Sequence, residues 1–173
     1  MASLILEDGS GVLNSTSYVD VDFADYYLGS NWAPSLEEKE QALVQASEYV
    51  DIRWGSLFKG TPATATQLLA LPRLSFTDGN NILITGIIPV NIKKAVCLYA
   101  KEFLKGTLYP DTTQLNAPIK RESVVAGPIQ ETIEYFDKAT ESSSPWLQFP
   151  LADALITPFL TTVKSNPVVR VIR

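Results

Sequence analysis

The residue types on which most enzymes and metal sites depend are missing from this sequence or nearly so. The chain of 173 residues contains no histidine, and its single cysteine is Cys97. A histidine general base, a zinc site with nitrogen and sulfur ligands and a disulfide within the chain are therefore excluded. Cys97 falls among apolar residues in a helical pattern, which favours a buried thiol over a reactive one. The sequence thus predicts a protein that is not an enzyme and carries no cofactor.

Two acidic groups, in residues 20–25 and residues 37–40, lie near predicted helix starts. Helix starts attract carboxylates through the helix dipole, which favours a solvated, capping role for the second group. The first group lacks the full pattern of a calcium loop, which needs acids at alternating positions together with a distal glutamate. Acid–base work by two carboxylates needs a cleft that separates their pKa values, and no pattern indicates one. We therefore expect neither a catalytic pair nor a metal site.

The lysines of residues 93–105 are the one cationic feature that suggests a ligand. Lys93, Lys94, Lys101 and Lys105 share a predicted helix with Tyr99 and Phe103, as in a groove that binds single-stranded nucleic acid. The two aromatic residues lie on the apolar stripe of that helix, however, so burial is favoured for them and the lysines remain a candidate interface. The net charge of −5 opposes nucleic-acid binding over the molecule as a whole.

Local signals predict three helices before residue 110. Asp20 is a good N-cap for a short helix that ends near Gly29. Ser35 and Glu38 form a capping box for a helix that reaches Gly55. Pro89 opens the third helix at its first position, and Gly106 ends it. Between them, residues 55–88 form an irregular connector with a short helix at residues 67–69 and a tight turn at residues 78–81.

The remaining elements are a hairpin, a short helix and a tail. Residues 119–125 and 129–135 alternate around Ala126-Gly127-Pro128, which predicts a β-hairpin. A short helix around residues 153–156 is limited by Pro158. Residues 166–173 are rich in β-branched and basic residues. Such a segment favours aggregation unless another surface covers it. Pairing with a neighbouring chain and docking on its own domain both satisfy that need.

The fold class that follows is mainly α with a small β component: a compact helical bundle with a β-hairpin and extended N- and C-terminal arms. Residues 1–19 form the N-terminal arm, residues 20–163 the helical domain with the hairpin at about 119–135, and residues 164–173 the C-terminal tail. With 46% hydrophobic residues the chain can bury a core without disulfides or metals. No apolar run is long enough to span a bilayer, and the start of the chain lacks the pattern of a signal peptide. We expect no membrane association.

A series of short motifs runs in order along most of the chain. They lie in residues 7–11, 17–19, 23–27, 38–55, 71–73, 88–89, 95–100, 120–122, 127–129 and 155–160. Each motif is weak alone, but their order is fairly specific, and it resembles the head–tail connector (adaptor, or head completion) proteins of tailed bacteriophages. That family is also described as DnaT-like single-stranded-DNA-binding proteins. Related chains tend to have tryptophan where this chain has Leu71, a change we interpret as packing.

The resemblance implies a structural virion protein of the neck between capsid and tail, made in the host cytoplasm. It implies a ring, commonly of twelve copies, that binds the portal protein and joins it to a tail-completion, stopper or tail-tube protein. The double-stranded genome would pass through the ring without sequence-specific contacts. The alternative function is a single-stranded-DNA-binding replication accessory protein.

Two sets of residues are the candidates for contacts in such a ring, and neither is catalytic or metal-binding. The portal or a neighbouring subunit is expected to contact the tail: Pro167, Val168, Val169, Arg170, Val171, Ile172 and Arg173. The inter-subunit or tail-side interface is expected to use the N-terminal arm and the hairpin: Leu4, Ile5, Leu6, Lys120, Arg121, Gly127, Pro128 and Ile129.

Overall fold

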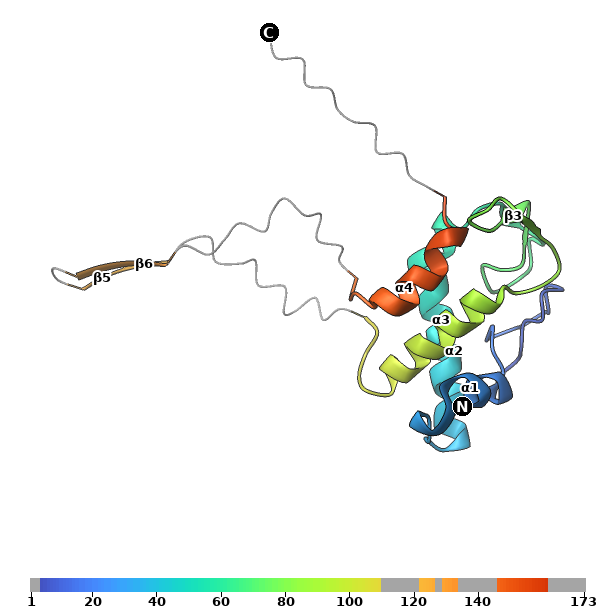
Figure 1. The fold of residues 1–173 in the computed structure, drawn as a ribbon, viewed down its shortest axis with the longest axis horizontal. Coiled ribbons are helices and arrows are strands. Elements are labelled where there is room, and N and C mark those ends of the chain that lie inside the picture. Colours follow the sequence, from blue (N-terminus) through green and yellow to red (C-terminus); the bar gives the residue numbers. More distant parts are fainter. Residues whose placement is uncertain (1–3, 110–121, 127–128, 134–145, 162–173) are drawn as a thin grey trace, which may run out of the picture. The chain divides into compact units, whose positions relative to one another are not determined.

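The computed structural model describes residues 4–109, 122–126, 129–133 and 146–161, the two middle segments as backbone only. These residues form four α-helices and three two-stranded antiparallel sheets, which confirms the predicted fold class (Figure 1). The chain divides into two units. A helical unit comprises Met1–Leu108 and Gln148–Arg173, and a hairpin unit comprises Tyr109–Leu147.

Helices α1 (Val21–Leu28) and α2 (Leu36–Trp54) begin where their capping residues predict. The Asp20 carboxylate accepts a hydrogen bond from the backbone N–H of Phe23 at 2.7 Å. Ser35 and Glu38 form the expected capping box at the start of α2, with both reciprocal bonds present. Short 3-10 helices, η1 (Gly29–Asn31) and η2 (Gly55–Leu57), follow the two α-helices.

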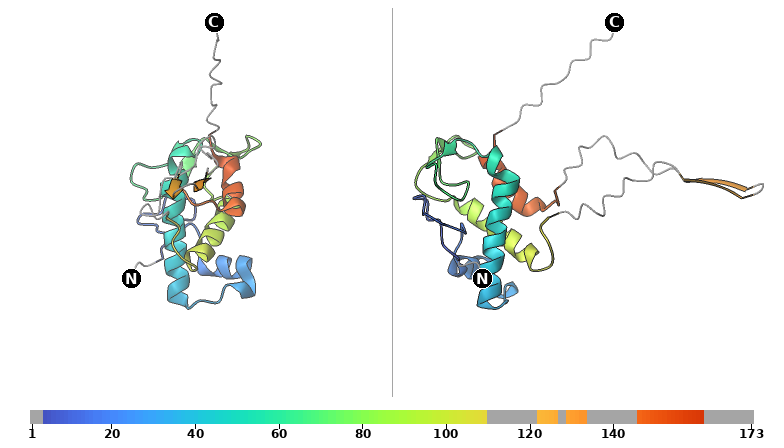
Figure 2. Two further views of the ribbon diagram at one scale, coloured as in Figure 1. Left: turned by 90° about the vertical axis from the view of Figure 1, so that its left-hand side faces the viewer. Right: turned by 180° about the vertical axis from the view of Figure 1, so that it is seen from behind.

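Helix α3 (Val90–Phe103) packs against both α2 and α4 (Pro150–Ile156), as the views in Figure 2 show. Pro89 is its N-cap, so the helix begins at Val90, one residue later than predicted. The apolar stripe is fully buried at Ile92, Ala95, Val96, Tyr99 and Ala100. It becomes more exposed at Phe103 and Leu104 because α3 ends there.

The connector contains four very short strands. Strand β1 (Thr61–Pro62) pairs with β2 (Arg73–Leu74), and β3 (Phe76–Thr77) pairs with β4 (Leu83–Ile84). The predicted turn between β3 and β4 is confirmed, since Asp78 bonds to Asn80, Asn81 and Ile82. Leu71 is fully buried, in agreement with its interpretation as a packing residue.

The predicted helix at residues 67–69 is wrong, because this segment forms bends. The side chain of Gln67 accepts from the N–H of Thr64 and donates to the carbonyls of Leu69 and Pro72. These local bonds fix the non-helical backbone.

The end of the described chain returns to the connector. Phe76 packs against Phe58 and Phe159, with ring centroids 6.1 and 5.6 Å apart respectively. Phe159 belongs to the 3-10 helix η4 (Thr157–Phe159), and the next residue, Leu160, forms an antiparallel bridge with Phe58. Residues about a hundred positions apart thus share one small aromatic core.

The N-terminal residues are less of an arm than predicted. Glu7, Ser17 and Tyr18 are fully buried, and Val19 is 1% exposed. Glu7 is satisfied by the N–H groups of Gly9 and Gly11 and by the Ser15 hydroxyl. A buried carboxylate with three donors fixes the turn of residues 7–15. Ser17 and Tyr18 then bond to Ser47 and Asp51 of α2, which holds this end of the segment on the helix.

The hairpin unit contains the predicted β-hairpin. Strand β5 (Glu122–Ala126) pairs with β6 (Ile129–Ile133), and the register joins Ala126 to Ile129 next to the turn. The flanking parts of the predicted strands lie outside the described residues.

Candidate nucleic-acid interface

Of the interface residues predicted from sequence, the structure describes Leu4, Ile5, Leu6 and Ile129. Leu4 and Leu6 are partly exposed and Ile5 is 38% exposed, and Leu6 forms a single parallel bridge with Ser17. Ile129 opens β6. The rest of both sets lies outside the described residues: Lys120, Arg121, Gly127, Pro128, Pro167, Val168, Val169, Arg170, Val171, Ile172 and Arg173.

Two lysines at the start of α3 instead meet aromatic rings from α1. The Lys93 ammonium lies 5.8 Å from the ring centroid of Phe23, and that of Lys94 lies 5.6 Å from the ring centroid of Tyr27. The two rings stack on each other, with centroids 6.4 Å apart and planes 25° from parallel. We call Phe23, Tyr27, Lys93 and Lys94 the aromatic–lysine face.

The local sequence positions these four side chains. Phe23 and Tyr27 are four residues apart, so they lie one above the other on the same side of α1. Helix α1 packs against α3, and the first turn of α3 contains no acidic residue. All four side chains remain partly exposed. The face therefore combines cations and ring surfaces that a ligand can reach.

Several charged and aromatic residues of α1 lie near the aromatic–lysine face. Asp25, the acid nearest in sequence to Tyr26, forms an ion pair with Lys39 at 2.8 Å. Tyr26 is 88% exposed, the highest value among the exposed large hydrophobic residues. Asp22 is exposed on α1 and reduces the positive potential by one charge. Hydrogen bonds from Ser10 and, to a smaller extent, the charge of Lys93 lower the pKa of Asp8, so Asp8 also offsets part of the positive charge of the face.

The aromatic residues predicted from the α3 pattern have another role. Tyr99 is fully buried, and its hydroxyl donates to Asp153 at 2.6 Å and accepts from the Trp54 indole N–H at 3.2 Å. Burial raises the pKa of Tyr99 far above its ordinary value. The structure thus confirms the expected burial of Tyr99. The aromatic partners of Lys93 and Lys94 are instead Phe23 and Tyr27 of α1.

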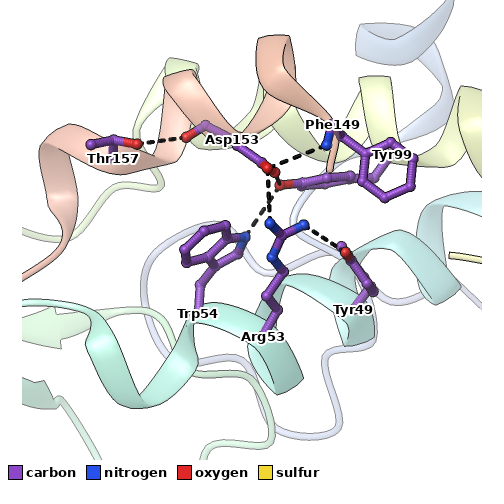
Figure 3. Close-up of polar contacts among 7 residues, drawn as sticks. All are labelled: Tyr49, Arg53, Trp54, Tyr99, Phe149, Asp153 and Thr157. Atoms are coloured by element: carbon purple, nitrogen blue, oxygen red, sulfur yellow. Dashed lines mark hydrogen bonds and ion pairs between the residues drawn. The ribbon is translucent and has the colours of Figure 1, made fainter. Parts of the chain in front are cut away.

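Around Tyr99 lies a polar network that joins α2, α3 and α4 (Figure 3). Asp153 of α4 binds the Arg53 guanidinium of α2 at 2.8 Å, and Arg53 also donates to the Tyr49 hydroxyl at 2.7 Å. The backbone N–H of Phe149 donates to the same carboxylate. Because the groups satisfy one another inside the helix packing, this network positions α4 and offers no group aimed at a substrate.

A second carboxylate with several polar partners, that of Asp51, joins α2 to the connector. Asp51 accepts hydrogen bonds from the Tyr18 hydroxyl and from the N–H of Ala70. Burial raises the pKa of Asp51 to about 6, and burial also raises the pKa of Tyr18. The Leu71 N–H donates to the same Tyr18 hydroxyl. Because Asp51 binds both this hydroxyl and the Ala70 N–H, residues 70–71 are anchored to α2.

Cys97 is fully buried, as predicted, and burial raises the pKa of its thiol to about 12. Among the described residues, no group of three or more histidine, cysteine, aspartate or glutamate side chains could hold a metal ion. Over the same part of the chain, no helix is long and apolar enough to cross a membrane.

Comparison with known proteins identifies a family. Residues 2–173 match the family model described as "Putative DnaT-like ssDNA binding protein". No curated protein matches the chain, and no solved structure does. The match covers nearly the whole sequence and agrees with the second description of the family that the motifs suggest. The chain belongs to the DnaT-like single-stranded-DNA-binding family.

Proposed function

We propose that this protein binds single-stranded DNA and that the aromatic–lysine face is its binding surface. The observation that carries the proposal is the pairing of Lys93 with Phe23 and of Lys94 with Tyr27 on a partly exposed face. The family description supports the same function.

The chemistry of the face suits unpaired nucleotides. An unstacked base lies flat on an aromatic ring, a contact worth about 1–3 kcal/mol per base, and the neighbouring phosphate binds an ammonium group. Bases in a duplex are already stacked and paired, so they cannot use the rings. Two lysines neutralise few phosphates, and the net charge of −5 repels the remainder of the strand. Binding is therefore selective for single strands, moderate in affinity and sensitive to salt.

Titration of a fluorescent single-stranded oligonucleotide at several salt concentrations tests this proposal. Replacing both lysines, Lys93→Gln with Lys94→Gln, should weaken binding at least about tenfold and reduce the salt slope by about 1 to 2. The control is Lys101→Gln with Lys105→Gln, which removes the same number of charges near the C-terminal end of α3 and just beyond it and should have a much smaller effect.

A Tyr27→Leu variant separates stacking from charge. It keeps an apolar side chain of similar reach, so we expect weaker binding with an unchanged salt slope. Equal binding by the parent, both lysine variants and Tyr27→Leu would disprove the assignment of the face. Equal affinity of the parent for duplex and single-stranded DNA would disprove the stacking mechanism.

The second candidate function is the head–tail adaptor that the motif order suggests. The observation that favours it is the hairpin, because a single two-stranded sheet is marginally stable alone and gains most from pairing with another chain. Contacts between copies and with tail-completion proteins would use Leu4, Ile5, Leu6, Lys120, Arg121, Gly127, Pro128 and Ile129. The portal or a neighbouring subunit would contact residues 167–173.

Assembly measurements distinguish the adaptor from the DNA-binding module. The chain should be mixed with purified portal rings and studied by native mass spectrometry and negative-stain imaging. An adaptor should add as a closed ring of copies, with head-to-tail contacts between two different surfaces. A chain that stays monomeric beside portal rings and binds single strands would leave only the first proposal.

A further inference from the structure

An open groove of about 480 Å³ lies between the β3–β4 turn, the start of α3 and the end of the described chain. The turn contributes Asp78 to Asn80, β4 contributes Ile84, and the start of α3 contributes Val90 and Asn91. Pro158 and Phe159 form another wall. None of these residues belongs to the aromatic–lysine face, so the groove needs its own explanation. We call it the β4–α3 groove.

Exposed apolar residues flank the groove's lining residues Ile84 and Pro89 in the sequence, and one of them, Val90, lines the groove itself. Ile82, Leu83, Ile87 and Val90 are 61%, 62%, 60% and 55% exposed respectively, and all lie within nine residues of one another. Asp78 is the one charged side chain among the groove's lining residues. Exposed apolar residues grouped in this way mark a binding surface. A fitting occupant is apolar and extended, with positive charge to complement Asp78.

The described chain leads to this groove from its C-terminal side. Pro158 and Phe159 line the groove. Two residues later, the backbone N–H and the hydroxyl of Thr161 both donate to the carbonyl of Leu57, at 2.8 and 3.0 Å. Residues 162–173 follow, and twelve residues can span about 40 Å. The last seven have the required composition, with four β-branched residues and two arginines and no acid.

We propose that, in the free protein, the β4–α3 groove binds the chain's own residues 167–173. The segment adds beside β4, whose outer edge carries the exposed Leu83. Val169 and Val171 alternate with Arg170, so the valines share one side of an extended segment and cover the apolar surface. The arginines complement Asp78. This interaction is independent of single-stranded-DNA binding and covers the surface that would otherwise favour aggregation.

Hydrogen exchange on the full-length chain tests the proposal reciprocally. Val169→Asp with Val171→Asp should accelerate amide exchange in residues 82–88 at least about tenfold. Leu83→Lys should accelerate exchange in residues 168–172 by a similar factor. The matched tail control is Thr162→Asp with Ser165→Asp, which introduces the same charge outside the proposed contact. The matched surface control is Leu36→Lys, at a residue 63% exposed at the start of α2.

The slow amides of α2 report whether each variant is folded, and they should exchange as in the parent. The proposal is overturned if residues 82–88 exchange equally in the two tail variants, or if Leu83→Lys and Leu36→Lys affect the tail equally. Loss of the protection on dilution by about a hundredfold would also overturn it, because the tail would then come from another copy.

Discussion

At the scale of single residues, Asp51 is the group whose surroundings most clearly change its chemistry. Its carboxylate is held by the Tyr18 hydroxyl and the N–H of Ala70, yet burial dominates and raises its pKa to about 6. The folded chain therefore binds a proton at Asp51 more readily than the unfolded chain does. Its contribution to stability is largest below the unfolded pKa of about 4 and is lost as the pH rises through about 6.

Asp51→Asn should remove this pH dependence while keeping one of the two accepted hydrogen bonds, because the Tyr18 hydroxyl and the Ala70 N–H donate to different carboxylate oxygens and an amide has a single oxygen. We expect the parent to lose about 2 kcal/mol more unfolding free energy than Asp51→Asn between pH 4 and pH 7. Urea unfolding of both proteins between pH 4 and pH 7 measures this difference in unfolding free energy. Because the other carboxylates are the same in both proteins, their contributions cancel. Parallel stability curves for the two proteins would contradict the role of Asp51.

At the scale of elements, the short helix α4 depends on one ion pair. It has seven residues and lacks a side-chain cap, so its own propensity is too small to hold it. Asp153 links it to Arg53, which is 8% exposed, and to Tyr99. Helix α4 is therefore ordered by tertiary contacts with α2 and α3.

Asp153→Ala should destabilise the protein by about 3 kcal/mol, because it removes the carboxylate from a buried guanidinium. Denaturant unfolding gives this value, and hydrogen exchange should show the largest acceleration in α4. The control is Asp22→Ala, an exposed aspartate in the first turn of α1, with an expected loss below about 1 kcal/mol. A loss for Asp153→Ala no larger than that of the control would show that apolar packing alone holds α4.

At the scale of the whole molecule, the proposed DNA-binding surface and the hairpin belong to different units. The aromatic–lysine face belongs entirely to the helical unit, whereas the hairpin belongs to residues 109–147. All residues of the polar network and of the aromatic core belong to the helical unit. The helical unit therefore has its own core and should fold without the hairpin.

Replacement of residues 110–145 by a flexible glycine–serine linker should leave the helical unit folded and its single-strand binding within about twofold of the parent. Near-ultraviolet circular dichroism and the oligonucleotide titration measure these outcomes. The same replacement should abolish ring formation on portals if the adaptor proposal is correct. An unfolded product would show that the hairpin unit contributes to the core.

Local patterns were sufficient for α1, α2 and α3 and for the pairing of β5 with β6. Asp20, Ser35 and Glu38 act on backbone groups within four residues, so their effect is visible in the sequence. The same reasoning failed at residues 67–69. There the Gln67 side chain binds backbone groups on both sides, and its competition with a helix does not appear in an apolar pattern.

The sequence by itself determined the absence of histidine chemistry, the main helices and the burial of Cys97 and Tyr99. Tertiary structure decided which residues meet. Lys93 and Lys94 pair with rings some seventy positions earlier, and Arg53 binds a carboxylate a hundred positions later. Glu7 is buried because later glycines and a serine turn back to it. Helical periodicity shows which side of a helix is buried, but the partner of that side depends on how the helices pack together.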